Sequence, residues 1–147
     1  MNKTNKMLII PEPVPANGNY APFHIEGNLI YVSGQLPIKD GKLVKSAGNN
    51  SFLDVASLQM ELVTLNILSH VMSAVNNDQS KIESCVKLTA YLVPPDDFFE
   101  HALISNIASD MINDFLKPIK NHTRTTIGIK SLPLGSLVEA DAIFKII

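Results

Sequence analysis

The spacing of apolar residues changes at Ser51, and this change limits the elements that the chain can form. From Ser51 to about Val75, apolar side chains recur every three or four residues, so they fall on one face of a helix. This face consists of Phe52, Ala56, Met60, Val63, Ile67, Val71 and Ala74. Ser51 is a candidate N-cap, because Asp54 follows three residues later in an arrangement close to a capping box. We expect a helix over residues 51–75 that ends at the polar run 76–80.

Shorter apolar runs on both sides of this helix predict strands. Residues 24–26 and 29–32 flank Gly27-Asn28, which is typical of a β-hairpin, and residues 39–42 predict another turn. Residues 84–93 predict a buried strand that stops at Pro94-Pro95. Residues 123–129 and 137–147 predict two strands near the C-terminus.

A second helical pattern runs from about residue 97 to 116. Its inner face consists of Ile104, Ile107, Ala108, Met111 and Phe115. The order β-β-α-β-α-β-β favours a single sheet with both helices packed on one face. The strands are too apolar for the opposite face to stay in water, so we expect oligomerisation to bury it.

The beginning of the chain predicts an extended segment. Three prolines between residues 11 and 15, followed by Asn and Gly, exclude regular structure there. The length of 147 residues is that of one ordinary domain. We therefore expect a single domain over residues 1–147, with residues 1–18 as a proline-rich lead-in.

Composition excludes several classes of protein. The net charge of −2 and the absence of a Lys/Arg cluster make a general nucleic-acid binder a poor fit. Cys85 is the single cysteine, which excludes an intrachain disulfide and suits a reducing compartment. Because Cys85 lies within an apolar run, it indicates a strand residue rather than a nucleophile. No signal peptide is recognised, and no window is expected to approach the ~20 apolar residues of a membrane span. We expect a cytoplasmic protein that does not bind a membrane.

Common catalytic motifs are missing from the sequence. There is no glycine-rich phosphate loop and no strand-borne GxSxG, and the four histidines lack the spacing of a zinc site. His70 is expected to be an ordinary, partly buried helix residue. We expect neither a metal nor a cofactor.

Charged residues within the last two apolar strands are the unusual feature. Alternation along residues 137–147 places Glu139 and Asp141 on the same face, opposite Val138 and Ala140. If the two strands pair, Arg124 could meet the far end of the other strand, or it could meet an adjacent subunit. Two explanations for Arg124 and Glu139 stay open. They could form a structural ion pair at a solvated edge of the sheet, or they could have a function, since burial of either charge is costly without a partner.

Several segments, in this order, resemble the RidA/YjgF/endoribonuclease L-PSP family. They are residues 19–22, residues 30–37, the helix with Asn106, residues 123–129, Leu132-Pro133 and residues 138–143. The resemblance spans about residues 17–147, and segments 121–124 and 132–135 are most similar to a longer-chain branch of the family. It implies a chorismate-mutase-like α+β subunit with a mixed sheet, and a homotrimer with clefts between subunits.

The resemblance also implies roles for individual residues. Arg124 matches the arginine that binds a substrate carboxylate, and Glu139 matches the glutamate that positions or activates water. The residues expected to line the cleft are Tyr20, Ser33, Gly34, Asn106 and Thr126. Thr126 stands where many members have a cysteine, so a role for a thiol is lost. The implied reaction is hydrolysis of an enamine or a 2-imino acid to a 2-keto acid and ammonia, without a cofactor.

Structural explanations compete with these roles. Tyr20 could cap the core, Ser33-Gly34 could be only a strand-ending turn, and Asn106 could be a solvated helix amide. The alternative function is a trimer that binds small carboxylates, or acts as a regulator, without turnover. An endoribonuclease ranks last, because the chain has no basic or aromatic track for a single strand.

Overall fold

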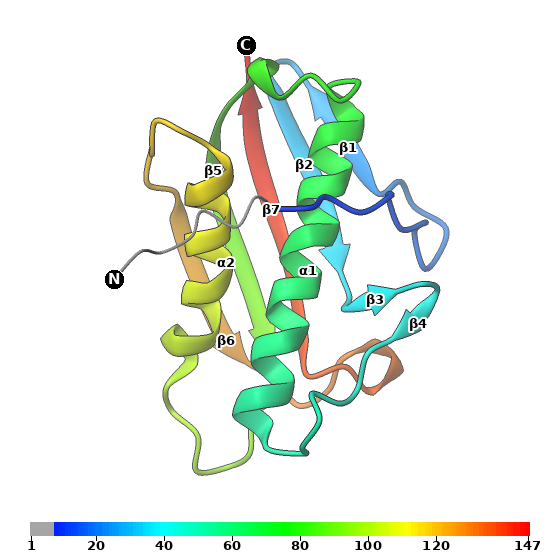
Figure 1. The fold of residues 1–147 in the computed structure, drawn as a ribbon, viewed down its shortest axis with the longest axis vertical. Helices are drawn as coiled ribbons and strands as arrows, with labels where there is room; N and C mark the ends of the chain where they lie inside the picture. The colour runs from blue at the N-terminus through cyan, green and yellow to red at the C-terminus, as the bar shows by residue number, and fades with distance from the viewer. Residues whose placement is uncertain (1–7) are drawn as a thin grey trace.

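The computed structural model describes residues 8–147 and contains two α-helices on one face of a five-stranded sheet (Figure 1). In chain order the elements are β1 (Phe23–Glu26), β2 (Leu29–Gln35), β3 (Ile38–Lys39), β4 (Lys42–Leu43), α1 (Phe52–Ala74), β5 (Ile82–Leu92), α2 (His101–Phe115), β6 (Thr123–Gly128) and β7 (Val138–Ile146). Short 3₁₀ turns cover Gln79–Lys81 and Pro133–Gly135.

The sheet is mixed, with the strand order β1-β2-β7-β5-β6. β5 and β6 are parallel, and α2 forms the crossover between them, whereas the other neighbours are antiparallel. The predicted α+β class, with two helices on one face, is confirmed. The expectation that the last two strands could pair is wrong, because β5 lies between β6 and β7.

Two tight hairpins form where the sequence has turn residues. Gly27 adopts φ +59 between β1 and β2, a conformation that glycine adopts without a steric penalty. Asp40 and Gly41 both have positive φ between β3 and β4, as a two-residue hairpin turn requires. The turn at residues 39–42 is therefore confirmed, and the structure adds a small separate sheet of β3 and β4 that the sequence did not predict.

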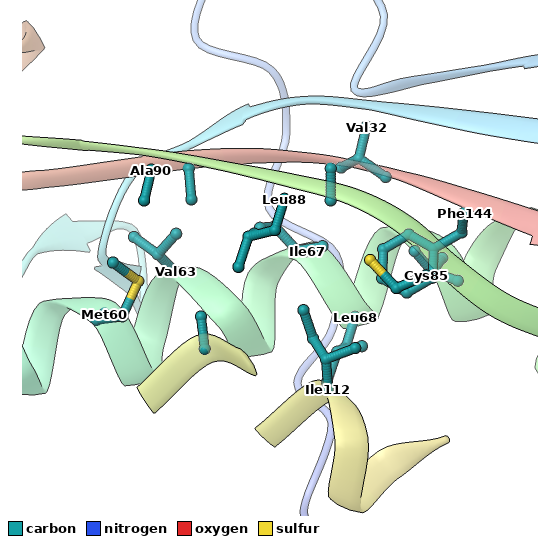
Figure 2. Packing of buried hydrophobic residues seen from close by; sticks show 14 of the residues in the cluster. Val32, Met60, Val63, Ile67, Leu68, Cys85, Leu88, Ala90, Ile112 and Phe144 are labelled. Atoms are coloured by element: carbon teal, nitrogen blue, oxygen red, sulfur yellow. The ribbon is translucent and has the colours of Figure 1, made fainter. Parts of the chain in front are cut away.

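The helical pattern after Ser51 is confirmed within a residue at each end. Ser51 Oγ accepts a hydrogen bond from the Asp54 backbone N–H at 3.2 Å, so it is the predicted N-cap. The inner face from Ala56 to Val71 is buried, and Figure 2 shows Met60, Val63 and Ile67 directed toward the strands. Asn76 and Asn77, both with positive φ, follow the helix and end it.

The second helix starts later than the sequence predicts. Residues 97–100 are not helical, because the chain first makes a turn in which the Phe98 N–H donates to the Pro95 carbonyl at 3.0 Å. The buried stripe is Ile104, Ala108 and Ile112, spaced by four residues, whereas Ile107, Met111 and Phe115 are only partly buried. The helix therefore presents a slightly different face from the expected one.

The proline-rich lead-in has no regular structure from residue 8 to 22, as expected. It crosses α1 (Figure 1), and Leu8 and Ile10 pack against the core. Residues 1–7 of the predicted lead-in lie outside the described residues.

Two further expectations concern buried groups. Cys85 is a buried strand residue, as predicted, and burial raises the pKa of its thiol to about 12. His70 is 1% exposed, rather than partly buried, because it lies on the side of α1 that faces Phe23. Burial lowers the pKa of this histidine, which favours the neutral ring.

α1 is long and apolar enough to cross a membrane, so the expectation that no such window exists is wrong by length and composition. However, 56% of that window is buried inside the fold. The helix therefore has the burial of a core helix, and its composition is weak evidence for a membrane span.

The N-cap of α1 makes a measurable contribution to stability. We predict that Ser51→Ala lowers the free energy of unfolding by ~1 kcal/mol, because the Asp54 N–H loses its acceptor. Urea unfolding at fixed protein concentration measures this loss. Ser57→Ala on the same helix is the control and should change stability by less than ~0.5 kcal/mol. Equal losses in the two variants would contradict the assignment of the cap.

Candidate functional site

Two buried polar side chains of α1 fix the loops at one end of the sheet. Asn66 Nδ2 donates to the carbonyls of Leu36 and Ile38, both at 3.0 Å. Gln59 donates through Nε2 to the Val44 carbonyl at 2.8 Å, and its Oε1 accepts from the Leu137 N–H at 2.9 Å. The segment after β2 and the segment before β7 are thereby held against the same helix.

A bulge in β2 makes room for Glu139. Val32 pairs with Ala142 and Gln35 pairs with Ala140, so Ser33 and Gly34 together lie opposite one residue of β7. The Glu139 carboxylate packs against Gly34, and a Cβ atom at position 34 would overlap with Glu139 Oε1. A side chain at position 34 would therefore displace the Glu139 carboxylate from this contact.

A cavity of about 250 Å³ opens beside this contact. Its wall includes Tyr20, Gly34 and Glu139, which are three of the predicted site residues. Asn17 of the lead-in and Pro133 of the loop before β7 complete it. Neither residue was predicted as a site residue, although Pro133 lies in one of the segments that resemble the family.

Ser33 is not among the residues that line this cavity. Its hydroxyl donates to the Ala21 carbonyl at 2.7 Å, and its backbone N–H donates to the Pro22 carbonyl at 2.9 Å. In this structure Ser33 thus attaches the segment that carries Tyr20 to β2. Its predicted contact with a ligand remains a prediction.

Glu139 is half-buried on the sheet face that the helices leave open. Burial raises the pKa of Glu139, and the nearby charge of Asp141 raises it further. Burial also raises the pKa of Asp141, although Tyr91 Oη donates to Asp141 Oδ2 at 3.1 Å and opposes this effect. A carboxyl group whose pKa is shifted toward neutrality is suited to giving and taking protons.

Arg124 belongs to a second polar cluster, between β6 and α2. Its Nη1 donates to Asn106 Oδ1 at 2.8 Å and to Ser109 Oγ at 3.0 Å. Ser109 Oγ also lies 2.8 Å from His122 Nε2. Arg124 and Asn106, both predicted as site residues, are therefore in direct contact.

Ser109 and His122 are not among the residues predicted from the sequence. A signal for both was available. Ser109 follows Asn106 by three residues, which places the two on one side of a helix. His122 precedes Arg124 by two residues, which places both on one face of a strand.

The two clusters lie on opposite faces of the sheet. Arg124 pairs with Leu88, whose side chain is buried beneath the helices, whereas Glu139 alternates with the buried Val138 and Ala140 and faces the other way. The suggested ion pair between Arg124 and Glu139 is therefore absent within one copy of residues 8–147.

Thr126 lies on the same face of β6 as Arg124. Its Oγ1 is buried and has no hydrogen-bond partner within residues 8–147. The same residues contain no group of three or more His, Cys, Asp or Glu side chains placed to hold a metal ion.

The model of the Endoribonuclease L-PSP family matches residues 11–146, and the chain belongs to this family. The crystal structure of Atu1372, a protein of unknown function from Agrobacterium tumefaciens, is 40% identical. The match covers 90% of this chain and 86% of that one, with a TM-score of 0.81.

Two more distant structures share the fold. RidA from a Psychrobacter species is 23% identical, with coverage of 95% and 97% and a TM-score of 0.64. TdcF from E. coli, solved with bound serine, is 21% identical, with coverage of 95% and 98% and a TM-score of 0.66. The predicted resemblance to the RidA/YjgF group is confirmed.

The shifted pKa of Glu139 predicts a pH-dependent effect of Glu139→Gln on stability. Since the folded-state pKa is raised, protonated Glu139 contributes stability below the ordinary value of 4.5, and this contribution is lost as pH rises through the folded-state pKa. Glutamine does not titrate, so Glu139→Gln should become more stable relative to wild type as pH rises through this window. Urea unfolding at a series of pH values from 4 to 8, at one protein concentration, measures the difference.

Glu83→Gln is the control with the opposite sign. Hydrogen bonds from Lys145 and Lys120 lower the pKa of Glu83, so this variant should lose stability relative to wild type as pH rises toward 4.5 and show no further change above it; for this control the pH series is extended below 4. A pH-independent difference for Glu139→Gln would show that its carboxyl group is not perturbed.

Proposed function

We propose that this protein hydrolyses 2-imino acids, and the enamines that tautomerise to them, to 2-keto acids and ammonia. The observation that carries the proposal is the fixed guanidinium of Arg124, which Asn106 and Ser109 hold at the edge of the sheet. A carboxyl group with a raised pKa, Glu139, supplies the complementary chemistry beside a cavity of small-molecule size.

Arg124 suits the carboxylate of such a substrate. Both hydrogen bonds that residues 8–147 provide to it use Nη1, which leaves Nε and Nη2 as donors for a bidentate carboxylate. Arg124 is also the only arginine in the sequence, beside 11 lysines. The planar guanidinium, which can bind both oxygens of a carboxylate, thus occurs only at the proposed binding position, and every other Lys or Arg position is a lysine.

The proposed reaction adds one water to the C=N bond. The water oxygen bonds to the imine carbon, the π electrons move to nitrogen, and the nitrogen takes a proton. The C–N bond of the resulting carbinolamine then breaks, so that ammonia leaves and the carbonyl of the keto acid forms. Glu139 accepts a proton from the attacking water and gives it to the imine nitrogen. It then accepts the hydroxyl proton of the carbinolamine and gives it to the leaving nitrogen, which requires a pKa closer to neutrality than that of an ordinary glutamate.

We further propose that the complete site forms between copies of the chain in a homotrimer. Arg124 and Glu139 face opposite sides of the sheet, so one copy would provide Arg124 with Asn106, and the next would provide Glu139 with Tyr20 and Gly34. The open face carries exposed apolar side chains, Tyr31 at 43% and Ile127 at 43%, which favours a covered surface in the assembly.

The distant structures are consistent with this ligand class. TdcF was solved with serine, a small amino acid whose carboxylate is the group that Arg124 would bind. Binding of small carboxylates without turnover is the alternative function, because the same guanidinium supports both. The family description as an endoribonuclease finds less support, since the net charge is −2 and Arg124 is the only arginine.

Removal of the guanidinium should abolish most of the activity. An amino-acid oxidase generates the imine, and release of keto acid and ammonia is followed with and without the protein. We expect Arg124→Ala to lower kcat/KM by about 10- to 100-fold, from the loss of a charged hydrogen bond. Lys120→Ala removes the same charge at the surface, where Lys120 contacts Glu83, and should leave kcat/KM unchanged. Binding of 2-ketobutyrate to wild type without imine turnover would select the alternative function.

Mixing of two impaired variants tests the shared site. Arg124→Ala and Glu139→Gln are unfolded together and refolded as a one-to-one mixture. In a ring in which each site takes one residue from each neighbour, about one quarter of the sites regain both groups. We therefore expect about a quarter of wild-type activity, which exceeds the residual activity of either variant refolded alone. No recovery in the mixture would place both residues of a site on the same copy.

A further inference from the structure

His122 and Ser109 form a chain of contacts that ends on the arginine. His122 immediately precedes β6 and lies two residues before Arg124, and Ser109 of α2 contacts both side chains. Ser109 Oγ is 3.0 Å from Arg124 Nη1 and 2.8 Å from His122 Nε2. Neither His122 nor Ser109 is needed for the reaction written above, so their arrangement calls for a separate explanation.

The direction of the hydrogen bond from Arg124 follows from its chemistry, and the tautomer of His122 decides the direction of the other hydrogen bond. A guanidinium only donates, so Ser109 Oγ must accept from Arg124. The single hydroxyl hydrogen of Ser109 is then available to His122 Nε2, which accepts it when the ring carries its proton on Nδ1. Burial and the positive charge of Arg124 both lower the pKa of His122, which favours the neutral, accepting ring. The hydrogen bond from Arg124 to Ser109 and the one from Ser109 to His122 then run in the same direction, and consecutive hydrogen bonds of this kind polarise and strengthen one another.

Ser105, one turn earlier on α2, shows what Ser109 would do without the histidine. The Ser105 hydroxyl donates to the carbonyl of His101, four residues before it, at 3.2 Å. This is the usual bond of a serine inside a helix. The Ser109 hydroxyl makes no such bond to the carbonyl of Ser105 within the described residues and is directed to His122 instead.

The burial of His122 is not explained by stability. Its Nδ1 is buried and has no hydrogen-bond partner within residues 8–147. An unpartnered polar atom in a buried place weakens a fold, and an apolar side chain of similar size would avoid this cost. A histidine at this position is therefore better explained by what its other nitrogen, Nε2, does for Ser109.

We propose that His122 and Ser109 are positioning residues, which hold the Arg124 guanidinium in the orientation that presents Nε and Nη2 to a carboxylate. His122 fixes the hydroxyl of Ser109, and Ser109 together with Asn106 fixes Nη1. The inference rests on the proposed function for the identity of the ligand. The restraint on the guanidinium itself can be measured without any ligand.

The experiment compares wild type, His122→Leu, His122→Gln and Ser109→Ala as full-length protein. Because Arg124 is the only arginine, its guanidinium ¹⁵N NMR signals need no assignment. We expect separate Nη1 and Nη2 signals in wild type, from restricted rotation, and averaged signals in His122→Leu and Ser109→Ala. Glutamine places an acceptor oxygen near the position of Nε2, so His122→Gln should restore the separate signals.

Calorimetry with 2-ketobutyrate and a thermal melt complete the test. We expect the Kd to rise about tenfold in His122→Leu and Ser109→Ala and to return to near the wild-type value in His122→Gln. The Tm of His122→Leu should be unchanged or higher, which a merely structural role would not give.

Separate Nη signals that persist in His122→Leu and Ser109→Ala would overturn the proposal, as would averaged signals in wild type. If the signals respond as expected but neither 2-ketobutyrate binding nor imine turnover is found, the positioning role stands and the proposed function fails.

Discussion

Alternation of side chains along the central strands is the constraint on which the rest of the structure depends. In β7, Val138, Ala140 and Ala142 lie beneath the helices, and Glu139 and Asp141 necessarily face the other way. In β6 the same rule directs Arg124 to α2. A shift of register by one residue would bury the carboxylates and expose the core, so the packing of the core and the placement of the charges cannot vary independently.

The polar residues of α1 connect this core to the cavity. Gln59 and Asn66 are 1% and 3% exposed, and each satisfies loop backbone groups that would otherwise be buried without partners. The cavity wall is thus built from loops that depend on the helix for their position. Gly34 completes the arrangement, because only the absence of a side chain allows the Glu139 carboxylate to approach the bulge of β2.

The electrostatic design follows from where each charge lies. Arg124 keeps its charge in any surroundings and has hydrogen-bond acceptors from α2, so it can serve as a fixed anion receptor at a sheet edge. Glu139 has no cationic partner within residues 8–147, and burial together with Asp141 raises its pKa. Arg124 is thus suited to binding the substrate carboxylate and Glu139 to proton transfer, which are the two roles that the proposed hydrolysis requires.

The sequence by itself determined the element types, because hydrophobic period, the N-cap at Ser51 and the turn residues at Gly27 are local signals. It also singled out Arg124 and Glu139, since charges within apolar strands are costly. It left open which strands are neighbours, and the late start of α2 at His101 depended on a turn at Pro95 that has no periodic signal. Only the tertiary structure placed β5 between β6 and β7 and set Arg124 and Glu139 on opposite faces of the sheet. It also brought Ser109 and His122 into contact with each other and Ser109 into contact with Arg124. The physical reason is that strand order and contacts between elements arise from long-range packing, which the local spacing of residues does not encode.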